Sequence, residues 1–136
     1  MKLNTDIRHI PLAVDRFVLT QEYPFKFVHK GKVKVVVIPK GFEWDGASVP
    51  RVAWSLLGFY PGGIMLAPSL PHDWGYIKKG RLTDKFTGDF AMTRKELDDL
   101  FLAHMLEVGM PPKKAKRAYY FVRVLGGLVW NGIIKL

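Results

Sequence analysis

The hydrophobic pattern of this chain changes period near residue 45, and this change constrains the fold more than any other feature. Between residues 25 and 37 apolar side chains recur at every second position, with several lysines between them. A period of two is typical of a half-buried β-hairpin, here turning near Gly31, and a further strand is expected over residues 17–20. The apolar face is expected to consist of the odd-numbered residues Phe25, Phe27, Val33, Val35 and Val37.

After residue 45 the pattern favours helices. Four are expected: residues 50–57 with Ser48 as the N-cap, residues 70–79 with Ser69 as the N-cap, residues 93–109, and a last helix that begins at Pro111-Pro112 and runs to about Gly126 or beyond. Thr93 and Glu96 have the spacing of a capping box at the start of the third helix. Residues 88–92 are expected to form a loop between the second and third helices.

The sequence therefore predicts a single α+β domain over residues 1–136, with an N-terminal antiparallel β-hairpin or sheet in residues 1–45 and helices in residues 46–136. Hydrophobic residues make up 49% and charged residues 24%, a balance typical of a folded globular chain rather than a disordered one. The absence of cysteine excludes a disulfide, a thiolate metal site and a thiol nucleophile. No apolar run reaches the ~18 residues of a membrane span, and the N-terminus lacks the apolar segment of a signal peptide.

The net charge of +9 indicates a partner rich in negative charge, such as nucleic acid, anionic lipid or an acidic protein. Four of the cations begin the last helix: Lys113, Lys114, Lys116 and Arg117. Cations at a helix N-terminus oppose the helix dipole, which favours an external partner for them. An ordinary solvated basic surface is the alternative.

The residues that carry chemistry begin with the sequence His72-Asp73-Trp74-Gly75-Tyr76. On a helix, His72 and Tyr76 stand four residues apart on one face, and Asp73 lies about 100° round from His72. A second helix could present a carboxylate to the imidazole from across a groove. A titratable base, an orienting carboxylate and a hard oxygen ligand together predict a hydrolytic site.

The third helix carries two aspartates, and a helical wheel separates them. Asp98 falls inside the apolar stripe of residues 93–109, whereas Asp99 falls on the wet side. A buried carboxylate needs a partner, and the candidates are His72, Tyr76 and Arg123. In the alternative interpretation Asp98 only caps or salt-bridges a packing helix.

Other polar residues have simpler interpretations. His104 is expected to be a structural histidine with satisfied hydrogen bonds, and no role is assigned to His9 or His29, which have no acidic residue near them in the pattern. Asp45, beside a glycine in an aromatic loop, is either a site residue or the start of an Asx-turn.

Two families have similar motifs. His72-Asp73-x-x-Tyr76 followed by Asp98-x-x-Phe101-x-x-x-Met105 resembles the active-site helices of secreted calcium-dependent phospholipases and their viral capsid relatives. That resemblance implies His72 as general base, Asp98 as its orienting group, Tyr76 as a hydrogen-bond donor to Asp98, and Asp73 as a calcium ligand. Asp45 would fold back to supply further oxygen to the calcium. The glycine-rich calcium loop and the disulfides of those enzymes have no match here.

Across a wider span, four motifs resemble a family of short phage and prophage proteins of unknown function. The motifs are Asp45-Gly46-Ala47-Ser48-Val49-Pro50, the His-Asp helix, Asp98-x-x-Phe101 and Val122-Arg123-x-x-Gly126. This resemblance implies a location in the virion or the host cytoplasm. The leading hypothesis is a phage-encoded, phospholipase-like hydrolase that acts on lipid or envelope esters. The alternatives are a non-catalytic virion or host-interaction protein that keeps the helix pair, and a basic nucleic-acid-binding module.

Overall fold

A computed structural model describes residues 9–13, 16–44 and 63–132 of the chain, and the burial of side chains in residues 17–44 and 64–132. Short antiparallel strands come first and helices follow, which confirms the predicted α+β fold. The elements are β1 (His9–Ala13), β2 (Arg16–Leu19), β3 (Tyr23–His29), β4 (Lys32–Ile38), β5 (Glu43–Trp44), the 3-10 turn η1 (Gly63–Met65), α2 (Leu66–Ile77), β6 (Arg81–Asp84), β7 (Gly88–Ala91), α3 (Arg94–Glu107) and α4 (Pro112–Trp130).

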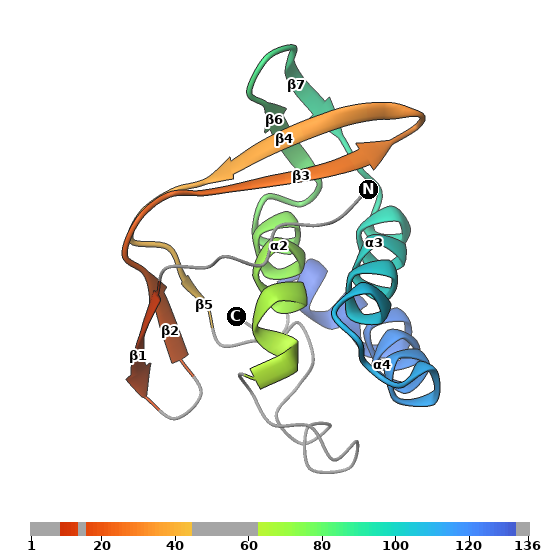
Figure 1. Cartoon of the computed structure of the whole chain (residues 1–136). Coiled ribbons are helices and arrows are strands. Elements are labelled where there is room, and N and C mark those ends of the chain that lie inside the picture. The colour runs from red at the N-terminus through yellow and green to blue at the C-terminus, as the bar shows by residue number, and fades with distance from the viewer. Residues whose placement is uncertain (1–8, 14–15, 45–62, 133–136) are drawn as a thin grey trace.

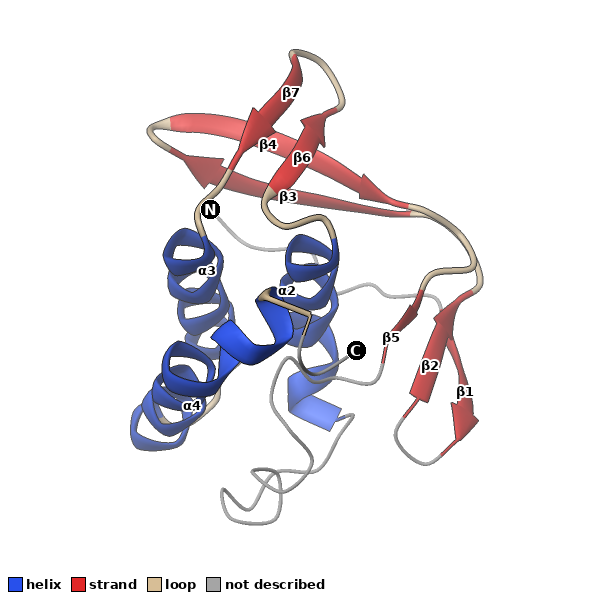
Figure 2. Cartoon of the chain, turned by 180° about the vertical axis from the view of Figure 1, so that it is seen from behind, coloured by secondary structure: helices blue, strands red, loops and turns tan. Residues whose placement is uncertain are grey.

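The β3–β4 hairpin lies across the ends of α2 and α3, with the β6–β7 hairpin beside β4 (Figure 1). The strands β1, β2 and β5 form a separate antiparallel sheet to one side of the helices (Figure 2). The main core lies between the β3–β4 hairpin and the helices, where Phe25 and Ile38 meet Leu70 and Leu97. No helix in the described part of the chain has both the length and the apolar composition needed to span a bilayer.

The predicted hairpin is present, but its apolar face on β4 differs from the prediction. Lys30 and Gly31 form a two-residue turn with φ of 51° and 75°, the backbone conformation that hairpin turns favour. This turn pairs odd-numbered residues of β3 with even-numbered residues of β4, so Phe25 lies opposite Val36 and Phe27 opposite Lys34. Paired residues share one face of a sheet, and the buried residues of β4 are therefore Val36 and Ile38. The prediction that Val33, Val35 and Val37 face the core is therefore wrong, and Val33 is 53% exposed.

The predicted loop over residues 88–92 is also wrong, since Gly88–Ala91 is a strand paired with β6. Strands of four residues are too short to show a clear alternation. Two hydrogen bonds of the Val35 main chain join the two hairpins: the Val35 N–H donates to Asp84 Oδ1 at 2.6 Å, and the Val35 carbonyl accepts from the Lys85 N–H at 2.8 Å. Lys34 Nζ lies 4.8 Å from the centre of the Phe90 ring and adds a side-chain contact between them.

The helices begin and end close to the predicted positions, with one exception. The capping box of α3 is confirmed, because Thr93 Oγ1 accepts from the Glu96 N–H and Glu96 Oε1 accepts from the Thr93 N–H. α2 begins at Leu66, and the prediction of Ser69 as its N-cap is wrong. The Ser69 hydroxyl donates instead to the Leu66 carbonyl at 2.9 Å. The helix expected over residues 50–57 and its cap Ser48 lie outside the described residues.

Candidate active site

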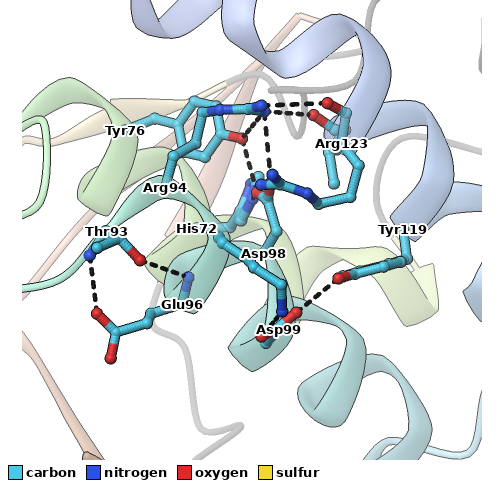
Figure 3. A network of polar contacts seen from close by, with 11 residues as sticks. His72, Tyr76, Thr93, Arg94, Glu96, Asp98, Asp99, Tyr119 and Arg123 are labelled. Atoms are coloured by element: carbon cyan, nitrogen blue, oxygen red, sulfur yellow. Dashed lines mark hydrogen bonds and ion pairs between the residues drawn. The ribbon is translucent and has the colours of Figure 1, made fainter.

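The helices α2 and α3 bring His72 and Asp98 together. Gly75 allows this approach, because a Cβ at that position would lie 2.5 Å from Leu97 Cδ2. His72 Nε2 is 2.7 Å from Asp98 Oδ1 (Figure 3). The wheel placed the two aspartates correctly, since Asp98 is fully buried and Asp99 is exposed. The predicted contact between His72 and Asp98 is therefore confirmed, whereas their catalytic roles stay predictions.

All three candidate partners of Asp98 contact it. The Tyr76 hydroxyl donates to Oδ1 at 2.6 Å, and Arg123 Nη1 from α4 donates to Oδ2 at 2.7 Å. Arg94 is a fourth partner, with Nη1 at 3.5 Å from Oδ2. Arg94 was not predicted as a partner from the sequence, although it stands four residues before Asp98 on the same helix, a spacing at which ion pairs form.

Arg94 also joins α3 to α4. Its guanidinium donates to the carbonyl oxygens of Val122 at 2.9 Å and Arg123 at 3.1 Å (Figure 3). Arg94 thus contacts both α4, which carries Arg123, and the Asp98 carboxylate, which Arg123 also contacts. Three helices therefore fix the orientation of the Asp98 carboxylate.

The surroundings set the charges of this cluster. Burial alone would raise the pKa of Asp98, but its hydrogen bonds with His72, Tyr76 and Arg123 lower it. Burial lowers the pKa of His72 by more than its contact with Asp98 raises it. Burial and the neighbouring Asp98 raise the pKa of the Tyr76 phenol, which keeps its proton. At neutral pH the cluster therefore holds an ionised Asp98 and a neutral His72.

A neutral His72 that donates from Nε2 to the carboxylate leaves Nδ1 as its proton acceptor, the tautomer that the contact with Asp98 favours. The ring stacks on Phe101 with centroids 4.3 Å apart, and its side chain is 2% exposed. His72 lines a cavity of about 10 Å³ between α2 and α3. This is near the lower limit of ~10–15 Å³ for one water molecule. The geometry suits a base that deprotonates a water molecule.

The predicted metal ligands are not brought together in the described residues. Asp73 lies on α2 and is 1% exposed, and Asp45 lies outside the described residues. Within residues 9–13, 16–44 and 63–132, no group of three or more His, Asp or Glu side chains could hold a metal. Calcium takes six to eight oxygen ligands, so the described residues do not fit a complete calcium site.

Two histidines differ from their predicted environments. His29, which was expected to have no acidic neighbour, lies with Nε2 2.7 Å from Glu96 Oε2 and joins β3 to the start of α3. The two residues are 67 positions apart, so no local pattern could reveal the contact. His104 is buried as expected, but the expected hydrogen bonds are missing: within the part of the chain that the structure describes, neither of its ring nitrogens has a partner.

Comparison with known proteins gives a family match and one significant curated relative. A sequence model of the family described as "Protein of unknown function (DUF1353)" matches residues 17–122, which include His72, Tyr76 and Asp98. The chain is 29% identical over 89 residues to "Uncharacterized protein y4jT" of Sinorhizobium fredii (strain NBRC 101917 / NGR234), a stretch that covers 65% of this chain and 23% of the relative. The match thus spans less than a quarter of that relative. No solved structure matches the chain significantly.

Proposed function

We propose that this chain, which belongs to the DUF1353 family, is an ester hydrolase in which His72 is the general base and Asp98 orients it. The observation that carries the proposal is the 2.7 Å contact from His72 Nε2 to an Asp98 carboxylate that Tyr76 also contacts. This arrangement leaves Nδ1 of a neutral imidazole as the proton acceptor. A phage origin and a phospholipid or envelope ester as substrate belong to the same proposal.

The proposed reaction needs a water molecule beside the base. Nδ1 of His72 takes a proton from the water molecule while the oxygen of that water molecule attacks the ester carbonyl carbon. The imidazolium that forms is stabilised by the negative Asp98, which does not itself take the proton. The imidazolium then returns the proton to the leaving alkoxide, and the products are an acid and an alcohol. Tyr76 and Arg123 position Asp98, and no step is assigned to a metal.

The outer face of α4 supports a lipid as the source of the ester. This face carries exposed apolar residues four positions apart, with Tyr120 63%, Val124 76% and Leu128 37% exposed. Exposed cations lie one or two turns before them: Lys113, Lys116 and Arg117. Adjacent cationic and apolar side chains suit the surface of an anionic bilayer.

A non-catalytic virion or host-interaction protein is the second candidate, and the burial of the cluster favours it. The His72 side chain is 2% exposed and Asp98 is fully buried between two arginines, as in ion-pair clusters that hold helices together. A nucleic-acid-binding module is the third candidate, and only the net charge of +9 supports it.

Fatty-acid release from phosphatidylglycerol vesicles tests the proposal. The parent protein should release fatty acid, and His72→Ala should lower the rate at least ~100-fold without loss of helical circular dichroism, because a general base contributes about that much. His29→Ala removes a histidine outside the cluster and should keep the parent rate. A parent protein that hydrolyses neither these vesicles nor a soluble aryl ester would contradict the hydrolase and leave the two non-catalytic candidates.

Calcium is a separate proposal that rests on Asp73 and Asp45. If these residues bind it, millimolar calcium should raise the midpoint of thermal unfolding of the parent protein, since a ligand that binds only the folded state stabilises it. Asp73→Asn should abolish that rise. An unchanged midpoint in the parent protein would remove calcium from the account.

A further inference from the structure

His104 is a fully buried imidazole that the proposed reaction does not yet use. It lies on α3, six residues after Asp98, and its ring stacks on Phe25 with centroids 5.3 Å apart and planes inclined by 22°. Neither Nδ1 nor Nε2 has a hydrogen-bond partner among the described residues. A buried polar group without a partner destabilises a fold, so such a residue indicates a ligand or a function.

His104 and His72 line the same cavity between α2 and α3. Its other lining residues are apolar: Pro68, Pro71, Leu97, Leu100 and Phe101. Among these lining residues, the two histidines are the ones whose side chains contain polar atoms. The volume of about 10 Å³ suits one water molecule.

The free ring nitrogens of the two histidines specify the kind of ligand. Burial lowers the pKa of His104 to about 4, so this ring is neutral at pH 7 and has one donor and one acceptor nitrogen. Nε2 of His72 contacts Asp98, which leaves Nδ1 of His72 for a ligand. A ligand between them must donate to one ring and accept from the other, which a neutral hydroxyl group can do.

We propose that this cavity binds one water molecule, which donates to Nδ1 of His72 and accepts an N–H hydrogen bond from His104. The water molecule would be the one that His72 deprotonates, and this part of the inference rests on the proposed hydrolysis. His104 is then a positioning residue, because it holds the oxygen of the nucleophile without taking its proton. This role explains why a polar side chain occupies a site with otherwise apolar neighbours.

A high-resolution crystal structure of the parent protein tests the binding site without any assay of activity. We expect one ordered water molecule within hydrogen-bond distance of ring nitrogens of both His72 and His104. In His104→Leu, which has a similar volume and no polar atom, this water molecule should be lost. A parent cavity without water, or a water molecule that contacts neither histidine, would overturn the proposal.

Steady-state kinetics test the positioning role. His104→Leu should lower kcat about tenfold to a hundredfold at unchanged KM, because a misplaced nucleophile slows the reaction without weakening substrate binding. His104→Gln should restore part of kcat, since its amide can donate to the water molecule. Met105→Leu is the control, because Met105 is a buried neighbour on α3 that does not line the cavity.

The two proposals can fail separately. If His104→Leu keeps the parent kcat, the positioning role is wrong even where a water molecule is present. If the parent protein has no hydrolytic activity, the proposed function is wrong, and the crystallographic result alone decides whether the cavity is a water site.

Discussion

Gly126 of α4 lies against the hydroxyl of Tyr76: a Cβ at position 126 would be 2.6 Å from Tyr76 Oη and 3.0 Å from Arg94 Nη1. Glycine, which has no Cβ, lets α4 approach α2 and α3 this closely. Arg123 lies three residues earlier on α4 and contacts Asp98. The close approach at Gly126 therefore helps to determine where Arg123 meets the carboxylate.

Gly126→Ala should destabilise the protein by about 1–3 kcal/mol, because overpacking forces Tyr76 and Arg94 to move. Gly127→Ala is the matched control. A Cβ at position 127 would lie 4.0 Å from its nearest neighbours, which are atoms of the Arg94 guanidinium, so it has room. Alanine is the better helix former, so this variant should gain up to about 1 kcal/mol. Urea denaturation of the two variants measures the difference, and equal stabilities would contradict the packing at Gly126.

Asp98→Asn should destabilise the protein by about 2–3 kcal/mol, because it leaves Arg123 without its carboxylate. This loss is smaller than that expected for a fully buried pair, since the Arg123 side chain is 27% exposed. Asp99→Asn is the control on the same helix, where an exposed pair with Lys95 should contribute less than about 1 kcal/mol. Similar losses in the two variants would show that the Asp98 cluster does not stabilise the fold.

Acid should destabilise the parent protein between pH 6.5 and 4, the interval between the ordinary pKa of histidine and the lowered pKa of His104. In this interval the unfolded chain binds a proton at His104 and the folded protein does not, so protonation favours unfolding. The loss is about 3 kcal/mol for this residue at about 1.4 kcal/mol per pH unit, and the lowered pKa of His72 adds to it in the same direction.

Urea denaturation at several pH values measures this dependence. His104→Leu should reduce the slope of stability against pH, because it removes one of the groups that titrate only on unfolding. A slope identical to that of the parent protein would mean that His104 already binds its proton in the folded state.

The outer face of α4 should bind anionic vesicles. Replacing Lys113, Lys116 and Arg117 with glutamine should weaken binding at low salt and flatten its salt dependence, because fewer counterions are displaced. Val124→Ser should weaken binding at all salt concentrations, since it removes apolar area. Vesicle sedimentation measures both effects. Equal binding to neutral vesicles, or binding only to DNA, would contradict a lipid partner.

The site could be predicted where one helix face determines the outcome. The spacing of His72 and Tyr76 and the position of Asp98 in the apolar stripe of α3 are local properties, and they identify His72 and Tyr76 as candidate partners of Asp98, which the structure brings into contact with it. The unpartnered nitrogens of His104 could not be predicted, because they depend on which side chains of α2 and β3 surround that ring.

For the fold too, two predictions from local signals are correct, whereas the prediction that depends on strand pairing is not. The capping box at Thr93 and the alternation in β3 are local signals, and both are correct. Which face of β4 is buried depends on the turn at Lys30, which pairs odd with even positions. The sequence of β4 alone favours the wrong face, because its odd positions are all valine, whereas both of its lysines share the even face with Val36 and Ile38.

The coupling between His72 and Asp98 in catalysis tests the central claim most directly. It is obtained from kcat/KM for fatty-acid release by the parent protein, His72→Asn, Asp98→Asn and the double variant. Asp98→Asn should lower the rate strongly in the parent protein and have no further effect once His72 is replaced, because residues that act as a unit are not additive. An equal loss from Asp98→Asn in both backgrounds would contradict the account, since Asp98 would then act independently of the base.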